Sequence, residues 1–299
     1  MNRKVFPSIL LLGLLFGTTL LASRFSVGQY NPLTYLGLRL VIASLGFIVA
    51  FVFRIANHRW PRDLRLWKHA VVIGILTSIT MMGIVTSMLY LSTGMTSILI
   101  TAGPAITVVL AHFFLEDEPI TWRKGVGVTL AISGATLLVV LGETGLPDVR
   151  SGSPIGYALV LTGILVASFT AIYIRKFMQD LDFYDVTSAR MIVAALIVMP
   201  LSLLLVGFDL SGVNLAGYLV LLYAAIPGTF FAFLLEFSNI QRFGATASVM
   251  VAYIIPIVAT IGGALVLGEQ ITVSMLAGLV LIAIGVWQIN KGTLIVRSL

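Results

Sequence analysis

Two stretches of the chain carry the same pattern of residues. Residues 103–134 read GPAITVVLAHFFLEDEPITWRKGVGVTLAISG, and residues 255–285 read IPIVATIGGALVLGEQITVSMLAGLVLIAIG. A shift of 151 residues relates these stretches and further positions outside them. The pairs related by this shift are Arg24 and Arg175, Arg39 and Arg190, Glu118 and Glu269, Gly127 and Gly278, and Gly134 and Gly285. Self-similarity at a fixed distance predicts that the chain consists of two copies of one structural unit.

The composition is that of an integral membrane protein. Of the 299 residues 59% are hydrophobic and only 10% are charged, and the mean hydropathy is +1.08. Apolar runs of about 20 residues, each long enough to cross the hydrocarbon core as a helix, recur along the chain. We predict ten such helices, near residues 5–24, 33–54, 69–92, 94–115, 121–141, 154–175, 184–207, 215–238, 242–266 and 272–290. These helices leave no room for a soluble domain.

Each copy of the unit holds five predicted helices, and this odd number determines how the copies insert. Two fused copies of an odd-numbered unit must enter the membrane in opposite orientations, which is a common plan of secondary transporters. We therefore predict an all-α integral membrane protein with ten transmembrane helices, arranged as two inverted-topology five-helix repeats. The repeats are residues 1–141 and 154–299, joined by a periplasmic linker over residues 142–153, and we expect them to pack as one transport domain.

The net charge of +6 results from an uneven distribution of basic residues. If the N-terminus is cytoplasmic, most of the 18 lysines and arginines fall on the cytoplasmic side of the predicted helices. This is the positive-inside pattern, and it predicts that both termini are cytoplasmic in a multi-pass protein of the inner membrane. We expect the lipid bilayer and a small-molecule substrate as partners, and no nucleic acid. The sequence leaves open whether the protein is a monomer or a homodimer.

The residues required for enzymatic chemistry are sparse. The chain has no cysteine, and its three histidines, His58, His69 and His112, lie far apart in the sequence. It has no GxxxxGK[ST] nucleotide-binding motif, so ATP is not expected to act directly. We therefore expect no metal or other cofactor and predict that the protein is not an enzyme. An intramembrane enzyme acting on lipid-linked substrates, or a channel, is the weaker alternative from a different class.

The duplicated motifs resemble a known family. Residues 12–39 read LGLLFGTTLLASRFSVGQYNPLTYLGLR, with a glycine in the first helix and an arginine in the second. With the proline, glutamate and spaced glycines of residues 103–134, this pattern is similar to the EamA-type repeat of the drug/metabolite transporter superfamily. The resemblance covers both halves, and is closest to the YddG-like branch of bacterial exporters of aromatic and other neutral amino acids. It implies ten helices, alternating access and export of metabolites such as amino acids.

The chain departs from related branches in one informative way. The predicted first helix, residues 5–24, contains no aspartate or glutamate. The mechanism of the small multidrug pumps, in which a glutamate of the first helix carries the proton, therefore does not transfer to this chain.

Two arginines fall deep within predicted helices. A charged side chain at the centre of a membrane helix costs about 2.5–3.5 kcal/mol, so Arg39 and Arg190 each need a partner or a wet cavity. The predicted topology puts Arg39 on the same side of the midplane as Glu269, and Arg190 on the same side as Glu118. We predict two ion pairs, Arg39 with Glu269 and Arg190 with Glu118, which help to close the two gates. The alternative is a static role in tying down helix ends.

Residues that lie near the midplane in only one half are candidates for substrate contact, because a solute breaks the two-fold symmetry. A mixture of aromatic, methionine and hydroxyl side chains suits a cavity for small amphipathic solutes. The candidates are Phe16, Thr19, Thr80, Met82, Thr101, Ser168, Phe169, Phe230, Phe231, Ser248 and Tyr253. Core packing or contact with lipid is the alternative for each of them.

Three further residues are candidates for movement or coupling. Pro104 and Pro256 fall within the fourth and ninth predicted helices, where each removes a backbone hydrogen bond and forms a hinge or a fixed kink. Glu236, near the end of the eighth helix, is a candidate proton carrier, or a partner of Arg242 or Arg190. The sequence thus predicts a secondary transporter that exports small neutral metabolites, amino acids first among them. A drug or nucleobase exporter of the same superfamily is the alternative.

Overall fold

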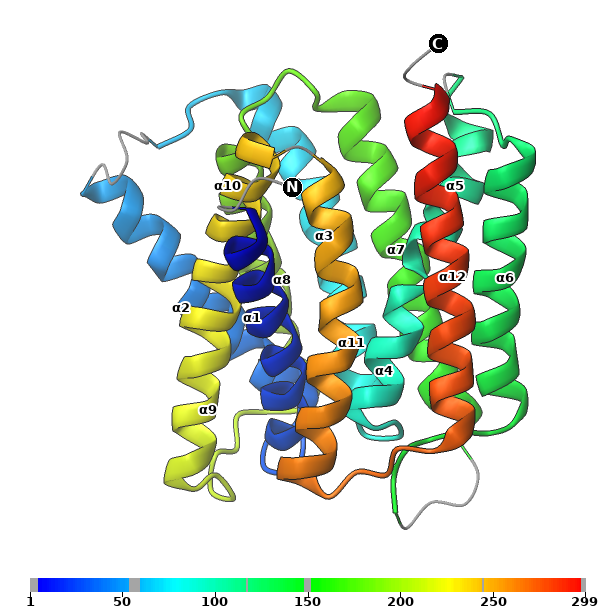
Figure 1. The fold of residues 1–299 in the computed structure, drawn as a ribbon. Helices are drawn as coiled ribbons and strands as arrows, with labels where there is room; N and C mark the ends of the chain where they lie inside the picture. Colours follow the sequence, from blue (N-terminus) through cyan, green and yellow to red (C-terminus); the bar gives the residue numbers. More distant parts are fainter. Residues whose placement is uncertain (1–4, 54–59, 117, 148–151, 244, 297–299) are drawn as a thin grey trace.

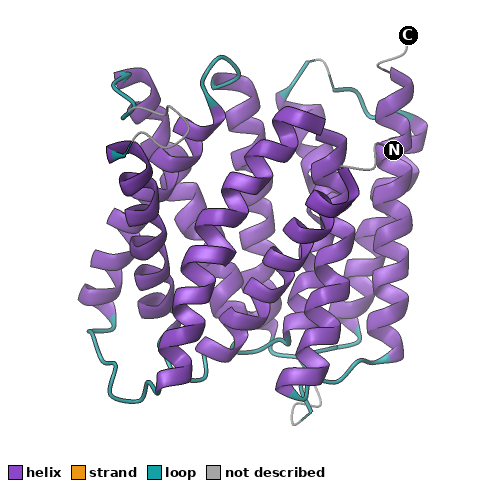
Figure 2. Ribbon diagram, turned by 60° about the vertical axis from the view of Figure 1, so that its left-hand side comes forward, coloured by secondary structure: helices purple, strands orange, loops and turns teal. Residues whose placement is uncertain are grey.

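The computed structural model describes residues 5–53, 60–116, 118–147, 152–243 and 245–296, and only the backbone of residues 5, 237, 240–243, 245–250 and 291–296. Within these ranges the chain is entirely helical and has no strand, and its loops gather at the two ends of one bundle (Figure 2). The helices are α1 Val5–Ser26, α2 Pro32–Val52, α3 Leu64–Ser87, α4 Thr93–Thr101, α5 Gly103–Phe114, α6 Trp122–Val140, α7 Pro154–Phe177, α8 Phe183–Leu205, α9 Leu215–Ala225, the π-helical segment η2 Ile226–Phe231, α10 Ala232–Phe243, α11 Ala245–Leu267 and α12 Val273–Val296.

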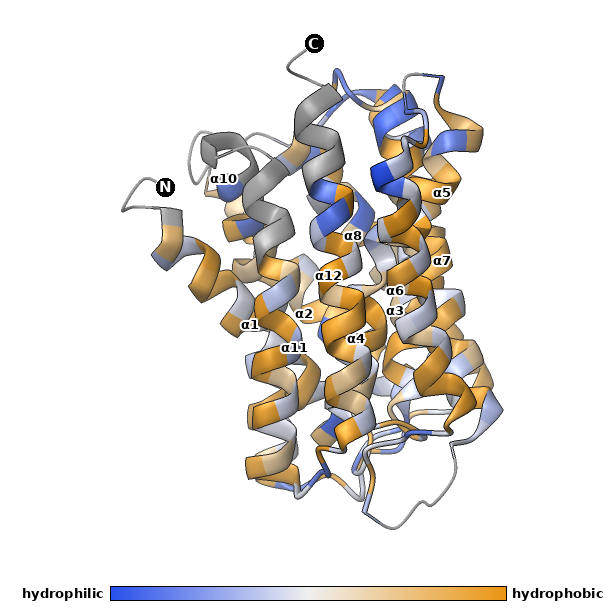
Figure 3. Ribbon diagram, turned by 45° about the vertical axis from the view of Figure 1, so that its right-hand side comes forward, coloured by the Kyte–Doolittle hydropathy of each residue, from blue (hydrophilic) through white to orange (hydrophobic). Residues whose placement is uncertain are grey.

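The described helices account for the ten predicted spans. Nine helical spans are long and apolar enough to cross a membrane, and α11 adds a shorter apolar stretch, Val251–Leu267, within the part whose side chains are described. Two spans are interrupted: α4 and α5 together form one, and α9, η2 and α10 form another. Apolar residues cover the middle of the bundle and polar ones its ends (Figure 3). Such a chain satisfies its backbone hydrogen bonds within helices because lipid offers no partners.

Polar side chains fix where many of the helices begin. At six helix starts an Asn, Asp, Ser or Thr accepts a hydrogen bond from a backbone N–H of the first turn, a contact that typically contributes about 1 kcal/mol. These N-cap residues are Asn31, Asp63, Ser92, Thr121, Asp182 and Asn214. The cap formed by Asp63 explains why α3 begins at Leu64 instead of the predicted residue 69: its carboxylate accepts a hydrogen bond from the backbone N–H of Arg65 at 2.8 Å.

The helix α1 begins and α12 ends at the same end of the bundle, which we call the terminal face; the other end is the opposite face (Figure 1). The loop residues 115–116, 118–121 and 178–182 lie at the terminal face, and the loops 88–92 and 268–272 lie at the opposite face. The helix α1 runs from the terminal to the opposite face, whereas α7, its counterpart under the shift of 151 residues, runs the other way.

The most extensive helix contacts join the two halves of the chain. The helix α6 packs along α12, α3 along α7, α1 along α11, and α2 along α8. Between α6 and α12 the backbones almost touch: a Cβ added to Gly127 would lie 2.5 Å from the carbonyl oxygen of Gly285, and one added to Gly285 would lie 2.5 Å from that of Gly127. Small residues permit this approach, and close packing drives helix association in lipid.

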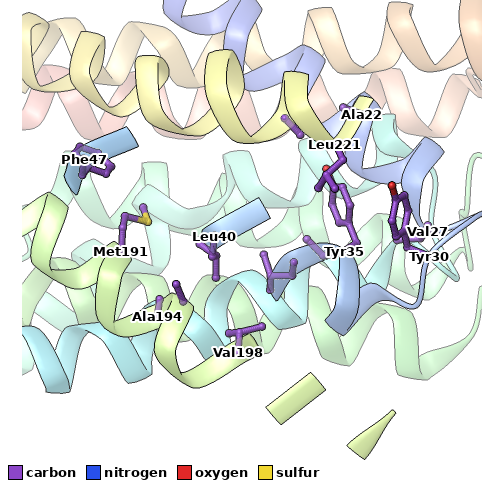
Figure 4. Packing of buried hydrophobic residues seen from close by; sticks show 14 of the residues in the cluster. Ala22, Val27, Tyr30, Tyr35, Leu40, Phe47, Met191, Ala194, Val198 and Leu221 are labelled. Atoms are coloured by element: carbon purple, nitrogen blue, oxygen red, sulfur yellow. The ribbon is translucent and has the colours of Figure 1, made fainter. Parts of the chain in front are cut away.

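A cluster of buried apolar side chains holds α2 against α8 and α9. Leu40 and Phe47 of α2 meet Met191 and Val198 of α8, and Leu221 of α9 joins the same cluster (Figure 4). Because lipid is as apolar as these side chains, the stabilisation comes from dispersion and close packing more than from hydrophobic transfer. The cluster fixes the relative positions of the helices that carry Arg39 and Arg190.

The two candidate hinge prolines differ in structure. Pro104 lies in the first turn of α5, and the helix is interrupted between α4 and α5 at Ala102. Pro256 lies inside the continuous helix α11. A proline is tolerated in the first turn of a helix, where its missing N–H would have had no partner. Pro227, which has no counterpart in the other half, lies in the π-helical segment η2.

Candidate functional site

Two Arg–Glu contacts join the halves of the chain at opposite ends of the bundle. At the opposite face, Nε of Arg24 lies 3.7 Å from Oε1 of Glu269. At the terminal face, a guanidinium nitrogen of Arg175 lies 2.6 Å from Oε1 of Glu118. The shift of 151 residues relates Arg24 to Arg175 and Glu118 to Glu269, so the two contacts are equivalent by the repeat. Each contact joins the first helix of one half to the loop after the fourth membrane span of the other half.

The predicted ion pairs, Arg39 with Glu269 and Arg190 with Glu118, were wrong. Arg39 is buried, and its guanidinium donates hydrogen bonds to Oγ1 of Thr229 at 2.8 Å and Oγ of Ser23 at 3.2 Å. The physical reason is depth. Arg39 and Arg190 each lie seven residues into a helix, or roughly 10 Å from its start, whereas the two glutamates lie in loops at the faces.

Glu269 connects two parts of the chain at the opposite face. Its carboxylate accepts hydrogen bonds from the backbone N–H and hydroxyl of Thr93, at 2.8 and 2.9 Å, and from the N–H of Gly94 at 3.4 Å. These donors form the N-terminus of α4, where unpaired N–H groups and the helix dipole favour an anion. A Cβ on Gly263 would lie 2.0 Å from the carboxylate, so only glycine permits this arrangement. Glu269 thereby links the α11–α12 loop to α4 in the other half.

Glu118 forms a second charged cluster at the terminal face. It accepts hydrogen bonds from Nζ of Lys124 at 2.7 Å and from Arg175 at 2.6 Å. Partial burial by itself would raise the pKa of the Glu118 carboxyl, but the hydrogen bonds from Lys124 and Arg175 outweigh burial and hold its pKa below the usual value. The carboxylate is therefore ionised at neutral pH and holds α6 and α7 at this face.

A cavity of about 540 Å³, which we call the pathway cavity, reaches from the middle of the bundle to Glu118 and Arg175 at the terminal face. Its polar lining comes from Thr107, Ser168 and Asn290, among mostly apolar residues of α3, α4, α5, α7 and α12. The hydroxyl of Thr107 donates to that of Ser168 at 2.9 Å. A mainly apolar cavity with few polar groups is the usual form of a small-molecule site.

A second cavity, of about 240 Å³, lies between α3, α7, α8 and α10, and we call it the arginine cavity. Arg190 lines it, with its guanidinium carbon 5.1 Å from the centre of the Phe233 ring. The other polar lining residues are threonines: Thr77, Thr80 and Thr170. Ala167 of α7 lines both cavities, so the two adjoin along this helix.

Several predicted substrate residues lie at these cavities or beside them. Thr80 lines the arginine cavity, and Ser168 lines the pathway cavity. Phe16 packs edge-on against Phe233 at 5.6 Å, next to the arginine cavity. Tyr253 accepts a weak hydrogen bond, at 3.5 Å, from Asn290 of the pathway cavity.

The other predicted substrate residues are engaged elsewhere. The hydroxyls of Thr19 and Thr101 are bonded to carbonyls of their own helices, and Phe169 and Phe230 pack against other aromatic rings. Met82 lines a groove with exposed apolar side chains, and Phe231 is 53% exposed; both positions face lipid in a membrane. The side chain of Ser248 lies outside the described residues. Hydropathy cannot separate these groups, because lipid-facing and cavity-facing positions are both apolar.

Glu236 lies in α10, one turn after Phe233, whose ring packs against the guanidinium of Arg190; Glu236 and Arg190 form no direct ion pair. The side chain of its other predicted partner, Arg242, lies outside the described residues. The role of Glu236 as a proton carrier therefore stays a prediction.

Sequence reasoning missed Arg24, Arg175, Lys124, Thr107 and Asn290. A signal was present for the first two, since the shift of 151 residues relates Arg24 to Arg175 just as it relates Glu118 to Glu269. Thr107 and Asn290 carry no such signal, because only their helix faces bring them to the pathway cavity.

The chain is similar to known transporters over nearly its full length. It is 24% identical to the uncharacterized transporter YoaV of Bacillus subtilis over 286 residues, which cover 95% of this chain and 96% of the relative. It is 24% identical to the uncharacterized inner membrane transporter YedA of Escherichia coli K12, with 90% and 84% covered. It is 25% identical to a probable amino-acid metabolite efflux pump of Salmonella typhimurium, with 96% and 95% covered.

A solved crystal structure of another protein has the same fold, with a TM-score of 0.68 over 100% of this chain and 99% of that one, at 17% identity. With its apolar helices and its inner-membrane relatives, the protein is a multi-pass protein of the inner membrane. The model of the EamA-like transporter family matches residues 5–140 and again residues 154–291, so each half of the chain carries its own match. The chain therefore belongs to the EamA-like transporter family.

Proposed function

We propose that this protein is a secondary transporter that exports small neutral metabolites, amino acids first among them, by alternating access. The observation that carries the proposal is a mainly apolar cavity that reaches from the middle of the bundle to one of two Arg–Glu contacts related by the shift of 151 residues. The pathway cavity reaches the contact of Arg175 with Glu118 at the terminal face, and the contact of Arg24 with Glu269 at the opposite face lines a separate cavity of about 490 Å³. The amino-acid substrate class is supported by one relative, named a probable amino-acid metabolite efflux pump.

The proposed topology has two inverted five-helix repeats, residues 1–141 and 154–299, with the linker 142–153 in the periplasm and both termini in the cytoplasm. The opposite directions of α1 and α7 and the separate family match of each half support this arrangement. Basic residues such as Arg65, Lys124 and Lys176 lie near the terminal face, which fits a cytoplasmic position. The opposite face is then periplasmic.

In this proposed arrangement the pathway cavity faces the cytoplasm, and Glu269 restrains the opposite face. The helix α4 packs against α11, and Glu269 holds the N-terminus of α4 to the loop that follows α11. At the other end, the pathway cavity reaches the terminal face. Export then requires Glu269 to release Thr93 and Gly94, so that a solute taken up from the cytoplasm leaves through the opposite face.

The proposal is tested by counterflow in proteoliposomes. Vesicles containing the purified protein are preloaded with unlabelled phenylalanine, threonine or methionine, and entry of the labelled amino acid is followed without any ion gradient. We expect saturable, protein-dependent accumulation of label, which a simple pore does not produce. Absence of accumulation for all three amino acids would refute amino-acid export. Accumulation of a labelled nucleobase or drug by the same vesicles would then support the alternative substrates.

A further inference from the structure

Arg190 and Arg39 are counterparts under the shift of 151 residues, yet their surroundings differ. Arg39 is buried and donates hydrogen bonds to Thr229 and Ser23. Arg190 lines the arginine cavity, and its Nε is buried without a hydrogen-bond partner. A buried donor without a partner loses its hydration and gains nothing in return, which costs several kcal/mol for a charged group. The asymmetry indicates that Arg190 has a partner that is not part of the protein.

The arginine cavity presents more donors than Arg190 alone. The hydroxyl of Thr80 is also buried without a partner, and it lines the same cavity. The ring of Phe233 packs against the guanidinium, a cation–π contact that uses none of its N–H groups. A planar guanidinium beside a free hydroxyl is well suited to a carboxylate, which accepts several hydrogen bonds at once.

Glu236 provides an acceptor on the same side of the arginine cavity. It lies three residues after Phe233 in α10, so the two side chains share one face of this helix. The ring of Phe233 packs against the guanidinium of Arg190, with the guanidinium carbon 5.1 Å from the ring centre. A carboxyl oxygen accepts hydrogen bonds, so an ammonium group next to the bound carboxylate can donate to Glu236. This arrangement favours a ligand that carries a carboxylate and an ammonium group side by side.

We propose that the arginine cavity binds the head group of an α-amino acid, with Arg190 and Thr80 donating to its carboxylate and Glu236 facing its ammonium group. This inference rests on the proposed transport function and names the chemistry that its substrates share. The volume of about 240 Å³ suits a head group better than a whole drug-sized molecule. The side chain of the ligand would extend past Ala167 into the pathway cavity, where Ile84, Ile164 and Val108 select neutral, mostly apolar groups.

The inference is tested by competition on the wild-type protein. Counterflow of labelled methionine is measured against unlabelled phenylalanine, phenylalanine amide, which lacks the carboxylate, and 3-phenylpropionate, which lacks the ammonium group. We expect phenylalanine to compete, and each of the two analogues to compete at least tenfold more weakly. Equal competition by phenylalanine amide would overturn the inference and leave amino-acid transport intact. Absence of methionine counterflow would overturn both.

Substitutions then test which residues bind the carboxylate and the ammonium group of the ligand. Arg190→Gln is expected to raise the methionine concentration for half-maximal counterflow roughly 10- to 100-fold, the effect of losing a charge-assisted hydrogen bond. Glu236→Gln is expected to reduce the preference for phenylalanine over 3-phenylpropionate. The control is Arg65→Gln, which removes an arginine from an exposed ion pair with Asp180, remote from the cavity. An unchanged half-maximal concentration in folded Arg190→Gln protein would contradict the assignment.

Discussion

The backbone N–H of Thr93 donates a hydrogen bond to the carboxylate of Glu269 across 2.8 Å, and so joins the start of α4 to the loop between α11 and α12. The contact links the two halves of the chain at the opposite face. Its counterpart carboxylate, Glu118, lies at the terminal face and is held by Lys124 and Arg175. The two related carboxylates thus hold different sets of donors in the same structure, which fits a carrier in one of two alternating states.

Glu269→Gln is expected to loosen the opposite face. Hydrogen bonds to a buried carboxylate contribute about 1.5–3 kcal/mol, so their loss shifts the balance of states roughly 10- to 100-fold toward opening. Because the chain contains no cysteine, a single cysteine placed by Thr107→Cys in the pathway cavity reports this opening. We expect faster labelling of that cysteine by an impermeant maleimide added from the periplasmic side.

The matched control for this prediction is Asp209→Asn. Asp209 lies in the loop after α8 at the same face, and its carboxylate caps only Ser211 of its own loop. Labelling of the Thr107→Cys protein should not change with Asp209→Asn. If Glu269→Gln left the labelling rate unchanged as well, Glu269 would have no role in gating.

The charged cluster around Glu118 gives a prediction about pH. Its pKa is lower in the folded protein than the ordinary value of 4.5, because the hydrogen bonds from Lys124 and Arg175 outweigh burial. A lowered pKa contributes stability that is present above the unfolded pKa and is lost as the pH falls through the folded pKa. Wild type should therefore melt at a higher temperature than Glu118→Gln at pH 7, and the difference should shrink only below about pH 4.5.

Thermal unfolding in detergent between pH 7 and about pH 2.5 measures this difference. Asp180→Asn, which removes the exposed ion pair with Arg65, is the control and should have a much smaller effect on the melting temperature. A melting difference for Glu118→Gln that stayed constant down to about pH 2.5 would show that the carboxylate charge is not what stabilises the cluster.

The two central arginines should differ in their contribution to stability. Arg39→Gln removes the partner of Thr229 and of Ser23 in a buried site, and we expect it to lower the free energy of unfolding by about 1.5–3 kcal/mol. Arg190→Gln should lower it less, since Nε of Arg190 has no partner to lose. Melting temperatures of both variants in the same detergent check this order, and the reverse order would falsify it.

The close contact between α6 and α12 can be tested by comparing two glycine substitutions in α6. A methyl group at Gly127 would lie 2.5 Å from the carbonyl of Gly285, so Gly127→Ala must push the helices apart and should cost about 1–3 kcal/mol. At Gly125, two residues earlier and on a different side of α6, the nearest atom to an added Cβ lies at 3.7 Å. Gly125→Ala should therefore leave the melting temperature unchanged or raise it slightly, since alanine favours a helix. Equal destabilisation by both substitutions would count against close packing as the cause.

The sequence by itself determined the helical spans and the duplication. Lipid provides no hydrogen-bond partners, so each long apolar run must form a helix, and hydropathy alone therefore finds the spans. The repeated positions of Glu118 and Glu269, and of Arg24 and Arg175, were also visible in the sequence.

Only the tertiary structure decided which repeated residues meet, and which helix faces line the cavities. Glu269 contacts Arg24 and not Arg39, because Arg39 lies roughly 10 Å deeper than the loop. Thr80 lines the arginine cavity, whereas Met82, two residues further along α3, lines a groove on the lipid side. In a soluble protein, the buried and the outward-facing sides of a helix would differ in polarity. In a membrane both are apolar, so the sequence carries little periodic signal, and the packing of the two halves alone separates them.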